Sequence, residues 1–185
     1  MAPSRERSIF NGSTSDSPTP DLASRLHVER KEGDYASYAT TKVDLPSGAL
    51  FARITTATPT KKSWSSVQVG EDSHIELNSE LVFINHSCDP NLVFDMAKFE
   101  VRVHEGKELK KGDNITFFYP SSEWNMAQPF ECSCGSEKCL GTIKGAGQIE
   151  EEVIRRFWLN EHIVKMLDAR KTKNGTNGHA NGHAN

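Results

Sequence analysis

The spacing of four cysteines constrains this chain more than any other feature of its sequence. Cys132, Cys134 and Cys139 form the cluster "CSCGSEKC", in which a glycine lets the chain turn between candidate ligands, and Cys88 stands far upstream. Structural zinc almost always takes four ligands drawn from cysteine and histidine, and Cys88 is the one cysteine left to complete the set. We predict one structural zinc with four thiolate ligands and no open position; the alternative is four unrelated buried or reactive thiols.

The composition favours metal binding over disulfides. The N-terminus, "MAPSRERSIFNGSTSDSPTP", lacks the apolar region of a secretory signal, and no run of about 18 apolar residues marks a membrane span. We therefore predict a cytoplasmic and/or nuclear protein, where thiols stay reduced, and no membrane partner. The net charge of -3 and the pI of about 6.2 imply no large basic patch, so direct nucleic-acid binding is not expected.

The chain of 185 residues predicts one folded domain between two polar ends. Residues 1–21 and the repetitive 171–185 have the composition of disordered segments. Alternating apolar residues and turn residues predict strands within 35–45, 49–59, 65–70, 74–78, 92–105 and 115–119. From Gln148 to Arg170 the apolar residues follow helical spacing, which predicts packing helices, with Asn160 capping a second, shorter one.

Three motifs occur in a fixed order: "NHSCDPN" at 85–91, "ITFFY" at 115–119, and then the cysteine cluster. Together they resemble the SET domain with its post-SET zinc segment, especially the small stand-alone SET proteins of fungi. That family comprises S-adenosylmethionine-dependent protein lysine methyltransferases. The resemblance covers residues 81–145 and, more weakly, 33–58.

The resemblance implies a mostly β fold of small sheets with a pseudoknot, a zinc-bound post-SET segment and C-terminal helices. The implied boundaries are a disordered arm, a SET domain, a post-SET segment, a helical segment and a disordered tail at residues 1–21, 22–130, 131–146, 147–170 and 171–185. The implied zinc ligands are the four cysteines already named.

The resemblance also assigns roles to residues of the site. Asn85 and His86 match the pair that lines the methyl-donor pocket, with Tyr35 and Ala36 in the turn beside it. Tyr119 matches the active-site tyrosine. Phe117 matches the position that sets how many methyl groups are added, and phenylalanine there resembles enzymes that make di- and trimethyllysine.

Physical chemistry supports an apolar acceptor channel in such an enzyme. Methyl transfer from a sulfonium needs an aligned, neutral amine, and desolvation favours the neutral amine by lowering its pKa. Phe83, Phe117 and Phe118 are the predicted channel walls. The alternative for these phenylalanines and for Tyr119 is plain strand core.

Three stretches differ from the family pattern. The register places Asp34 and Ala36 where the family has a Gly-x-Gly turn, "RITTA" replaces its Glu-Tyr-x-Gly-Glu strand, and Phe118 replaces an acid. The region of the family's peptide groove is a short insert, residues 59–80, in which we expect Trp64 to be buried against the core and His74 to be a strand-face residue. A small or flexible amine acceptor is therefore plausible beside a peptide.

The predicted function is methyl transfer from S-adenosylmethionine to a lysine side chain of a protein or to a small-molecule amine, by a monomer. The alternative is a SET-like scaffold without this activity, either a binding module or an enzyme repurposed for another reaction on a metabolite. Fold alone does not separate these functions, because function depends on the site.

Overall fold

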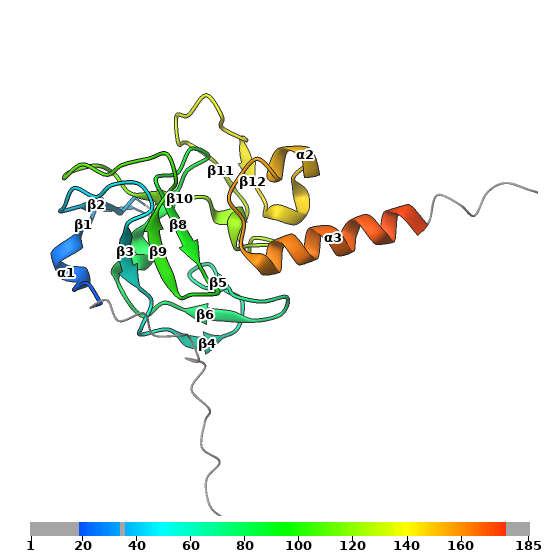
Figure 1. Ribbon diagram of the computed structural model, residues 1–185, viewed down its shortest axis with the longest axis horizontal. Coiled ribbons are helices and arrows are strands. Elements are labelled where there is room, and N and C mark those ends of the chain that lie inside the picture. Colours follow the sequence, from blue (N-terminus) through cyan, green and yellow to red (C-terminus); the bar gives the residue numbers. More distant parts are fainter. Residues whose placement is uncertain (1–18, 34–35, 177–185) are drawn as a thin grey trace, which may run out of the picture.

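The computed structural model describes residues 19–33 and 36–176 as four small sheets with short helices around them (Figure 1). The strands are β1 Leu26–Glu29, β2 Tyr38–Thr41, β3 Leu50–Arg53, β4 Thr58–Thr60, β5 Val67–Gln68, β6 His74–Glu76, β7 Asn85–His86, β8 Leu92–Asp95, β9 Glu100–Val103, β10 Thr116–Phe117, β11 Phe130–Glu131 and β12 Thr142–Ile143. The helices are α1 Leu22–Arg25, α2 Glu151–Ile154 and α3 Glu161–Thr176, with 3-10 turns η1 Glu80–Phe83, η2 Tyr119–Ser121 and η3 Ala146–Gln148. The predicted mostly β architecture is confirmed.

The largest sheet has five strands in the order β3-β9-β8-β10-β7. Strands β8 and β9 form an antiparallel hairpin, with Phe94 opposite Val101 and Leu92 opposite Val103. All four of these side chains are fully buried, as the alternation of the sequence predicts for a strand that packs one face on a core. Strand β8 of this hairpin pairs with β10, which leads to Tyr119.

Strand β10 occupies an unusual place in that sheet. It pairs in parallel with both β7 and β8, which directly follow one another in the chain. The loop 87–91 that joins β7 to β8 therefore crosses over β10, a strand far away in the sequence. This crossover is the place at which the pseudoknot is predicted, and Cys88 lies in the crossing loop.

The smaller sheets surround the site. Strands β1 and β2 form an antiparallel pair, and β4, β6 and β5 form a three-stranded sheet from the insert at 59–80. The β11–β12 pair flanks the cysteine cluster. In Figure 1, α1 and β1–β2 lie on the opposite side of the five-stranded sheet from α2 and α3.

The C-terminal helices form a second core. Phe118, Ala146, Ile154, Ile163 and Leu167 are buried together, with Phe157 and Trp124 packed at their edge. The apolar stripe predicted for this segment is thus a packing surface. Helix α3 continues to Thr176, past Arg170, where the predicted helical segment ends, and it is longer than α2 rather than shorter.

Two local predictions are wrong. The side chain of Asn160 does not cap α3: its Oδ1 accepts from the Met96 backbone N–H, and its Nδ2 donates to the carbonyls of Phe94 and Ser121. Asn160 is buried, so these strand and turn groups, which lie out of reach of water, take its hydrogen bonds first. The side chain of Trp64 is 68% exposed rather than buried against the core.

No helix among residues 19–33 and 36–176 combines the length and the apolar character that crossing a membrane requires.

Candidate functional site

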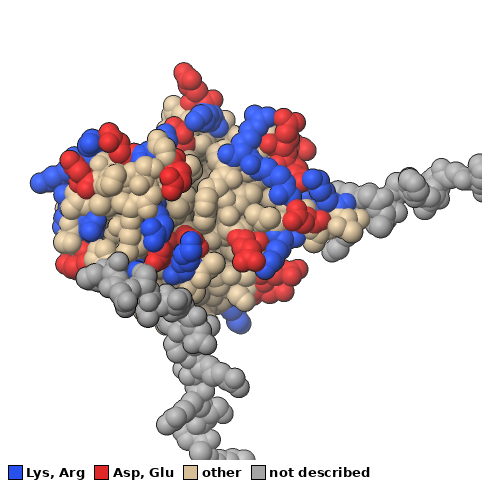
Figure 2. Space-filling view, viewed as in Figure 1, with Lys and Arg blue, Asp and Glu red and all other residues tan. Residues whose placement is uncertain are grey.

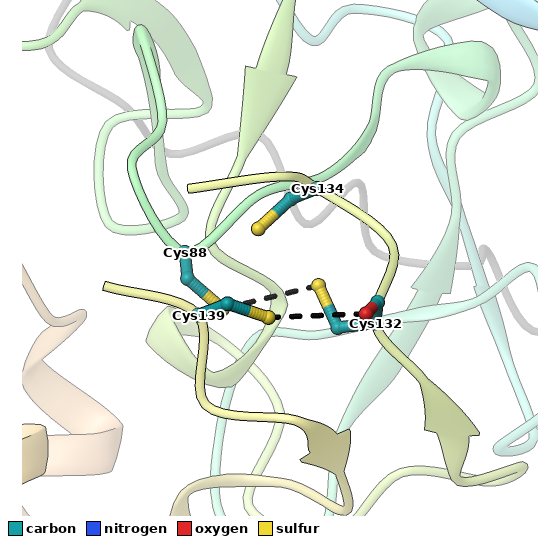
Figure 3. A group of neighbouring side chains, drawn as sticks. All are labelled: Cys88, Cys132, Cys134 and Cys139. Atoms are coloured by element: carbon teal, nitrogen blue, oxygen red, sulfur yellow. Dashed lines mark hydrogen bonds between the residues drawn. The ribbon is translucent and has the colours of Figure 1, made fainter. Parts of the chain in front are cut away.

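The four cysteines converge at one point of the structure. Their sulfur atoms all lie within 4.8 Å of one another, and Figure 3 shows them gathered from the crossing loop and from the segment after β11. The Sγ atoms of Cys88 and Cys132 are 3.9 Å apart. Tetrahedral zinc with Zn–S bonds of roughly 2.3 Å places its sulfur ligands roughly 3.8 Å apart, so this donor set fits a structural zinc.

Cys88 is the most buried of the four cysteines. The Leu140 backbone N–H donates to its sulfur at 3.4 Å, and Nε2 of His86 lies 3.3 Å from the same atom. Burial raises the pKa of Cys88 to about 11 in the metal-free chain. A bound cation reverses this preference, because metal coordination stabilises the thiolate.

Asp89 ties the crossing loop to its surroundings. Its carboxylate accepts from Lys107 at 2.9 Å and from Lys138, which lies in the cysteine cluster, at 3.1 Å. The hydrogen bond from Lys107 keeps the pKa of Asp89 below its ordinary value. The crossing loop therefore contacts the segment 132–139 through a carboxylate as well as through the cysteines.

Asn85 joins β7 to the turn predicted for the methyl donor. Its Nδ2 donates to the Ser37 carbonyl at 3.0 Å. Gly33 has a φ of +107°, a conformation that favours glycine, and its carbonyl accepts from the Ala36 N–H at 3.4 Å. Asp34 and Tyr35 lie outside the described residues. A glycine, Gly33, therefore has positive φ here, one position before Asp34, which the sequence register places at the first glycine of the family's turn.

Tyr119 follows β10 and lies beside His86. Its backbone N–H donates to Nδ1 of His86 at 3.1 Å, and its hydroxyl donates to the Ile84 carbonyl at 3.4 Å. Burial raises the pKa of Tyr119, so the hydroxyl stays protonated at neutral pH and acts as a donor. Burial also lowers the pKa of His86 to about 4, which keeps its imidazole neutral.

The three phenylalanines predicted as channel walls lie in different places. Phe117 stacks on Phe94 at 4.1 Å, and its ring is 4.7 Å from that of Tyr119. Phe83 ends η1 and packs against the core that contains Leu92, Phe94 and Val101, with the guanidinium of Arg30 4.8 Å from its ring centre. Phe118 points to the second core and stacks on Phe157 at 3.9 Å.

Two residues of this site were not predicted from the sequence. The ring of Phe130 lies 5.6 Å from His86 and 6.0 Å from Tyr119 and completes an aromatic enclosure around them. An aromatic residue directly before the "ECSC" stretch was a usable signal. Glu123 was the other, and its backbone N–H donates to the Tyr119 carbonyl at 3.0 Å.

A cleft of about 360 Å³ lies elsewhere, between the β5–β6 turn and α3. It is lined by Gly70, Asn160, His162, Met166 and neighbouring residues. None of Asn85, His86 and Tyr119 contributes to it. Its size alone therefore does not make it the reaction site.

Comparison with known proteins agrees with this geometry. The family model described as the SET domain matches residues 9–120. The chain belongs to the SET-domain family. It is 50% identical over 149 residues to methyltransferase flvH of Aspergillus flavus, covering 80% of this chain and 84% of that relative.

Other SET proteins share a shorter region. The H3 lysine-36 specific histone-lysine N-methyltransferase of Mycosarcoma maydis is 37% identical over 75 residues, which is 37% of this chain but 7% of that protein. The crystal structure of KRYPTONITE with mCHG DNA and SAH aligns with a TM-score of 0.48 and 18% identity over 63% of this chain and 28% of that one. The predicted activity is confirmed at family level: the chain is a SET-type methyltransferase that uses S-adenosylmethionine.

Proposed function

We propose that this chain methylates an amine nitrogen at the junction of β7 and β10, with Tyr119 as the catalytic residue. Asn85, His86, Tyr35 and Ala36 surround the methyl donor in this proposal. Phe83 and Phe117 line the acceptor channel, and we leave out Phe118 because it packs on Phe157.

One observation carries the proposal. The parallel pairing of β7 with β10 sets Asn85 opposite Thr116 and His86 opposite Phe117, two residues before Tyr119. The donor-side pair and the acceptor-side aromatic residues thus meet across one strand pairing. Such a juxtaposition is what transfer between two bound molecules requires.

The side chains around Tyr119 suit an amine acceptor. When bound, S-adenosylmethionine supplies a methyl group on a positively charged sulfur. The rings of Phe117, Tyr119 and Phe130 provide apolar surroundings that favour the neutral, nucleophilic amine over the ammonium ion. The protonated hydroxyl of Tyr119 already donates to the Ile84 carbonyl, so its oxygen lone pairs remain available to orient the amine.

The acceptor is a lysine side chain of a protein or a small-molecule amine. Relatives named as histone-lysine N-methyltransferases favour a protein lysine. The insert 59–80 favours a small or flexible amine, since it forms only the short β4–β6–β5 sheet where the family has a peptide groove. The ring of Phe117, which lacks a hydroxyl, favours more than one methyl transfer per nitrogen.

The four cysteines hold a structural zinc in this proposal, and the enzyme acts as a monomer in the cytoplasm and/or the nucleus. We propose no direct contact with nucleic acid. On the face shown in Figure 2, Lys and Arg alternate with Asp and Glu, and no broad basic surface of the kind that binds phosphate backbones is present there.

Calorimetric titration of the zinc-loaded protein with S-adenosylmethionine, and with its demethylated product, tests the donor site. We expect micromolar binding that Asn85→Ala abolishes and that Asn125→Ala, a change at an exposed asparagine, leaves intact. A labelled methyl group then reports transfer to lysine peptides and to small diamines. Tyr119→Phe is expected to keep donor binding and to lose transfer.

The alternative is a SET-like scaffold without this activity, and the non-glycine residues Asp34 and Ala36 favour it. If neither donor nor product binds, the scaffold explains the fold and the methyltransferase proposal fails. If the donor binds but no amine among peptides and diamines is methylated, the pocket has been repurposed.

A further inference from the structure

His86 stands between the cysteine cluster and Tyr119 and contacts both. Nε2 of its ring lies 3.3 Å from the Cys88 sulfur, and Nδ1 lies 3.1 Å from the Tyr119 backbone nitrogen. The rings of Phe118, Tyr119 and Phe130 enclose it at 5.2 to 5.6 Å. A histidine whose two nitrogens are both engaged has no ring atom left for another hydrogen bond.

The contacts fix the direction of both hydrogen bonds. A backbone N–H only donates, so Nδ1 of His86 must accept from Tyr119 with its lone pair. A neutral imidazole with a lone pair on Nδ1 carries its proton on Nε2. That proton points at the sulfur of Cys88, and a metal-bound thiolate is an acceptor.

We infer that His86 is a positioning residue that links the zinc cluster to Tyr119, donating from Nε2–H to the Cys88 thiolate and accepting from the Tyr119 N–H at Nδ1. The role of Tyr119 rests on the proposed function, whereas the two hydrogen bonds do not. The route is short: a change at the metal moves the Cys88 sulfur, the imidazole follows, and the backbone after β10 follows the imidazole. Hydrogen bonds to metal ligands commonly tune both the metal and its surroundings.

Asparagine and glutamine separate the two halves of this link. The amide of asparagine reaches the position of Nδ1, so His86→Asn keeps an acceptor for Tyr119 and loses the donor to Cys88. The amide of glutamine reaches the position of Nε2, so His86→Gln keeps a donor to sulfur and loses the acceptor. His104→Asn is the matched control, because Nδ1 of His104 contacts the backbone carbonyl of the next residue and not the cluster.

Two readouts need no catalysis. In the cobalt-loaded full chain, loss of the N–H···S bond makes the thiolate a better electron donor, so its charge-transfer band moves to longer wavelength in His86→Asn and stays near the original in His86→Gln. In the zinc-loaded chain, the amide resonance of Tyr119 shifts, and its hydrogen exchange speeds up, in His86→Gln more than in His86→Asn. His104→Asn leaves both signals unchanged.

The link from the metal through His86 to Tyr119 can be tested first in the unmutated chain. Replacing zinc by the larger cadmium lengthens the metal–sulfur bonds, and the amide resonance of Tyr119 shifts in the unmutated chain. In His86→Asn that shift is lost, and kcat for methyl transfer falls about tenfold with little change in KM.

The inference is overturned if the Tyr119 amide resonance does not shift when cadmium replaces zinc. It is also overturned if the cobalt charge-transfer band is identical in the unmutated chain and in His86→Asn. Spectral shifts in a chain that transfers no methyl group leave the link standing and overturn the proposed function instead.

Discussion

Tyr119 is fixed from two sides, and the two sides differ in chemistry. The zinc-side anchor consists of His86, Cys88 and the rest of the cysteine cluster, and it reaches the Tyr119 backbone N–H. The helix-side anchor consists of Gln68, Glu123 and Trp124, and it reaches the Tyr119 carbonyl through the Glu123 N–H. Each anchor joins the end of β10 to a segment distant in sequence.

The helix-side anchor is built from hydrogen bonds alone. The carboxylate of Glu123 accepts from the Gln68 N–H at 2.7 Å, and the Gln68 side-chain oxygen accepts from the Trp124 N–H at 2.8 Å. Nε2 of His74 lies 4.0 Å from Glu123 and has no hydrogen-bond partner among the described residues. One side of Tyr119 is therefore joined to a set of candidate metal ligands, and the other side is joined to a buried carboxyl group.

Of the changes considered, removal of a zinc ligand in the zinc-side anchor should lower the stability of the fold the most. Cys139→Ser removes one ligand, and structural zinc contributes on the order of 10 kcal/mol to the folding of zinc-finger peptides. We expect loss of the metal and unfolding of the segment around β11 and β12, measured by metal content and thermal unfolding. Ser133→Ala, at an exposed position between two ligands, is the control and should change neither. Full stability of a metal-free chain would rule out the zinc proposal.

A region could be predicted from the sequence where its structure depends on a local pattern or on a fixed ligand count. It could not be predicted where the structure depends on contacts between polar residues far apart in the sequence. The zinc cluster was predictable because zinc chemistry demands four ligands and the chain has four cysteines. The hairpin around Phe94 was predictable because alternation is a local signal. The helix-side anchor was missed: Gln68 and Glu123 are polar residues that resemble solvated ones in sequence, and only the fold buries them.

Asn160 and Trp64 show the same limit in opposite directions. Asn160 stands at the start of a helix, where asparagine usually caps, but burial against β8 and η2 gives its amide better partners. Trp64 is apolar enough for a core, yet its side chain is 68% exposed, while Val67, three residues on, is buried. In both cases, tertiary surroundings that no local pattern encodes decide the outcome.

Gly145 offers a test of the helix-side anchor's backbone. Its φ is +115°, and a Cβ added there would lie 2.5 Å from the Trp124 carbonyl oxygen. Gly145→Ala should cost roughly 3–5 kcal/mol, because the strain of positive φ adds to a clash with backbone that cannot move aside. Chemical denaturation measures this cost.

Gly141→Ala separates strain from clash. Its φ is +70°, but a Cβ there meets nothing within 4 Å, so we expect a loss of about 1–2 kcal/mol from strain alone. Equal losses in the two variants would show that the close approach to Trp124 does not matter.

The stability of the fold should depend on pH through the carboxyl group of Glu123, in the helix-side anchor. Burial raises the pKa of Glu123 from 4.5 to about 7. Between those values the folded protein holds a proton that the unfolded chain has released, so this contribution to stability falls as pH rises from 4.5 through 7, by up to about 3 kcal/mol. Glu123→Gln keeps an acceptor for the Gln68 N–H and should remove this decline.

The measurement is the free energy of unfolding from pH 5 to 8 in both proteins, compared as a difference. The two proteins are compared because His74 also contributes to the pH dependence. Burial lowers the pKa of His74, so its contribution to stability is lost as pH falls through 6.5, whereas the contribution of Glu123 is lost as pH rises. Parallel curves for the unmutated chain and Glu123→Gln would show that the carboxyl is ionised in the fold at every pH tested.

Trp64 lies outside both anchors and should show the smallest effect on stability. Its side chain is 68% exposed, so Trp64→Ala should change the free energy of unfolding by no more than about 0.5 kcal/mol. It stands in the insert 59–80, and if the acceptor passes over this insert, the aromatic face would attract a second cationic group of the acceptor by about 1 kcal/mol. We therefore expect KM for a diamine or lysine peptide to rise about fivefold, with kcat unchanged. A fall in kcat at constant KM would instead connect Trp64 to Tyr119 and contradict the separation of the insert from the two anchors.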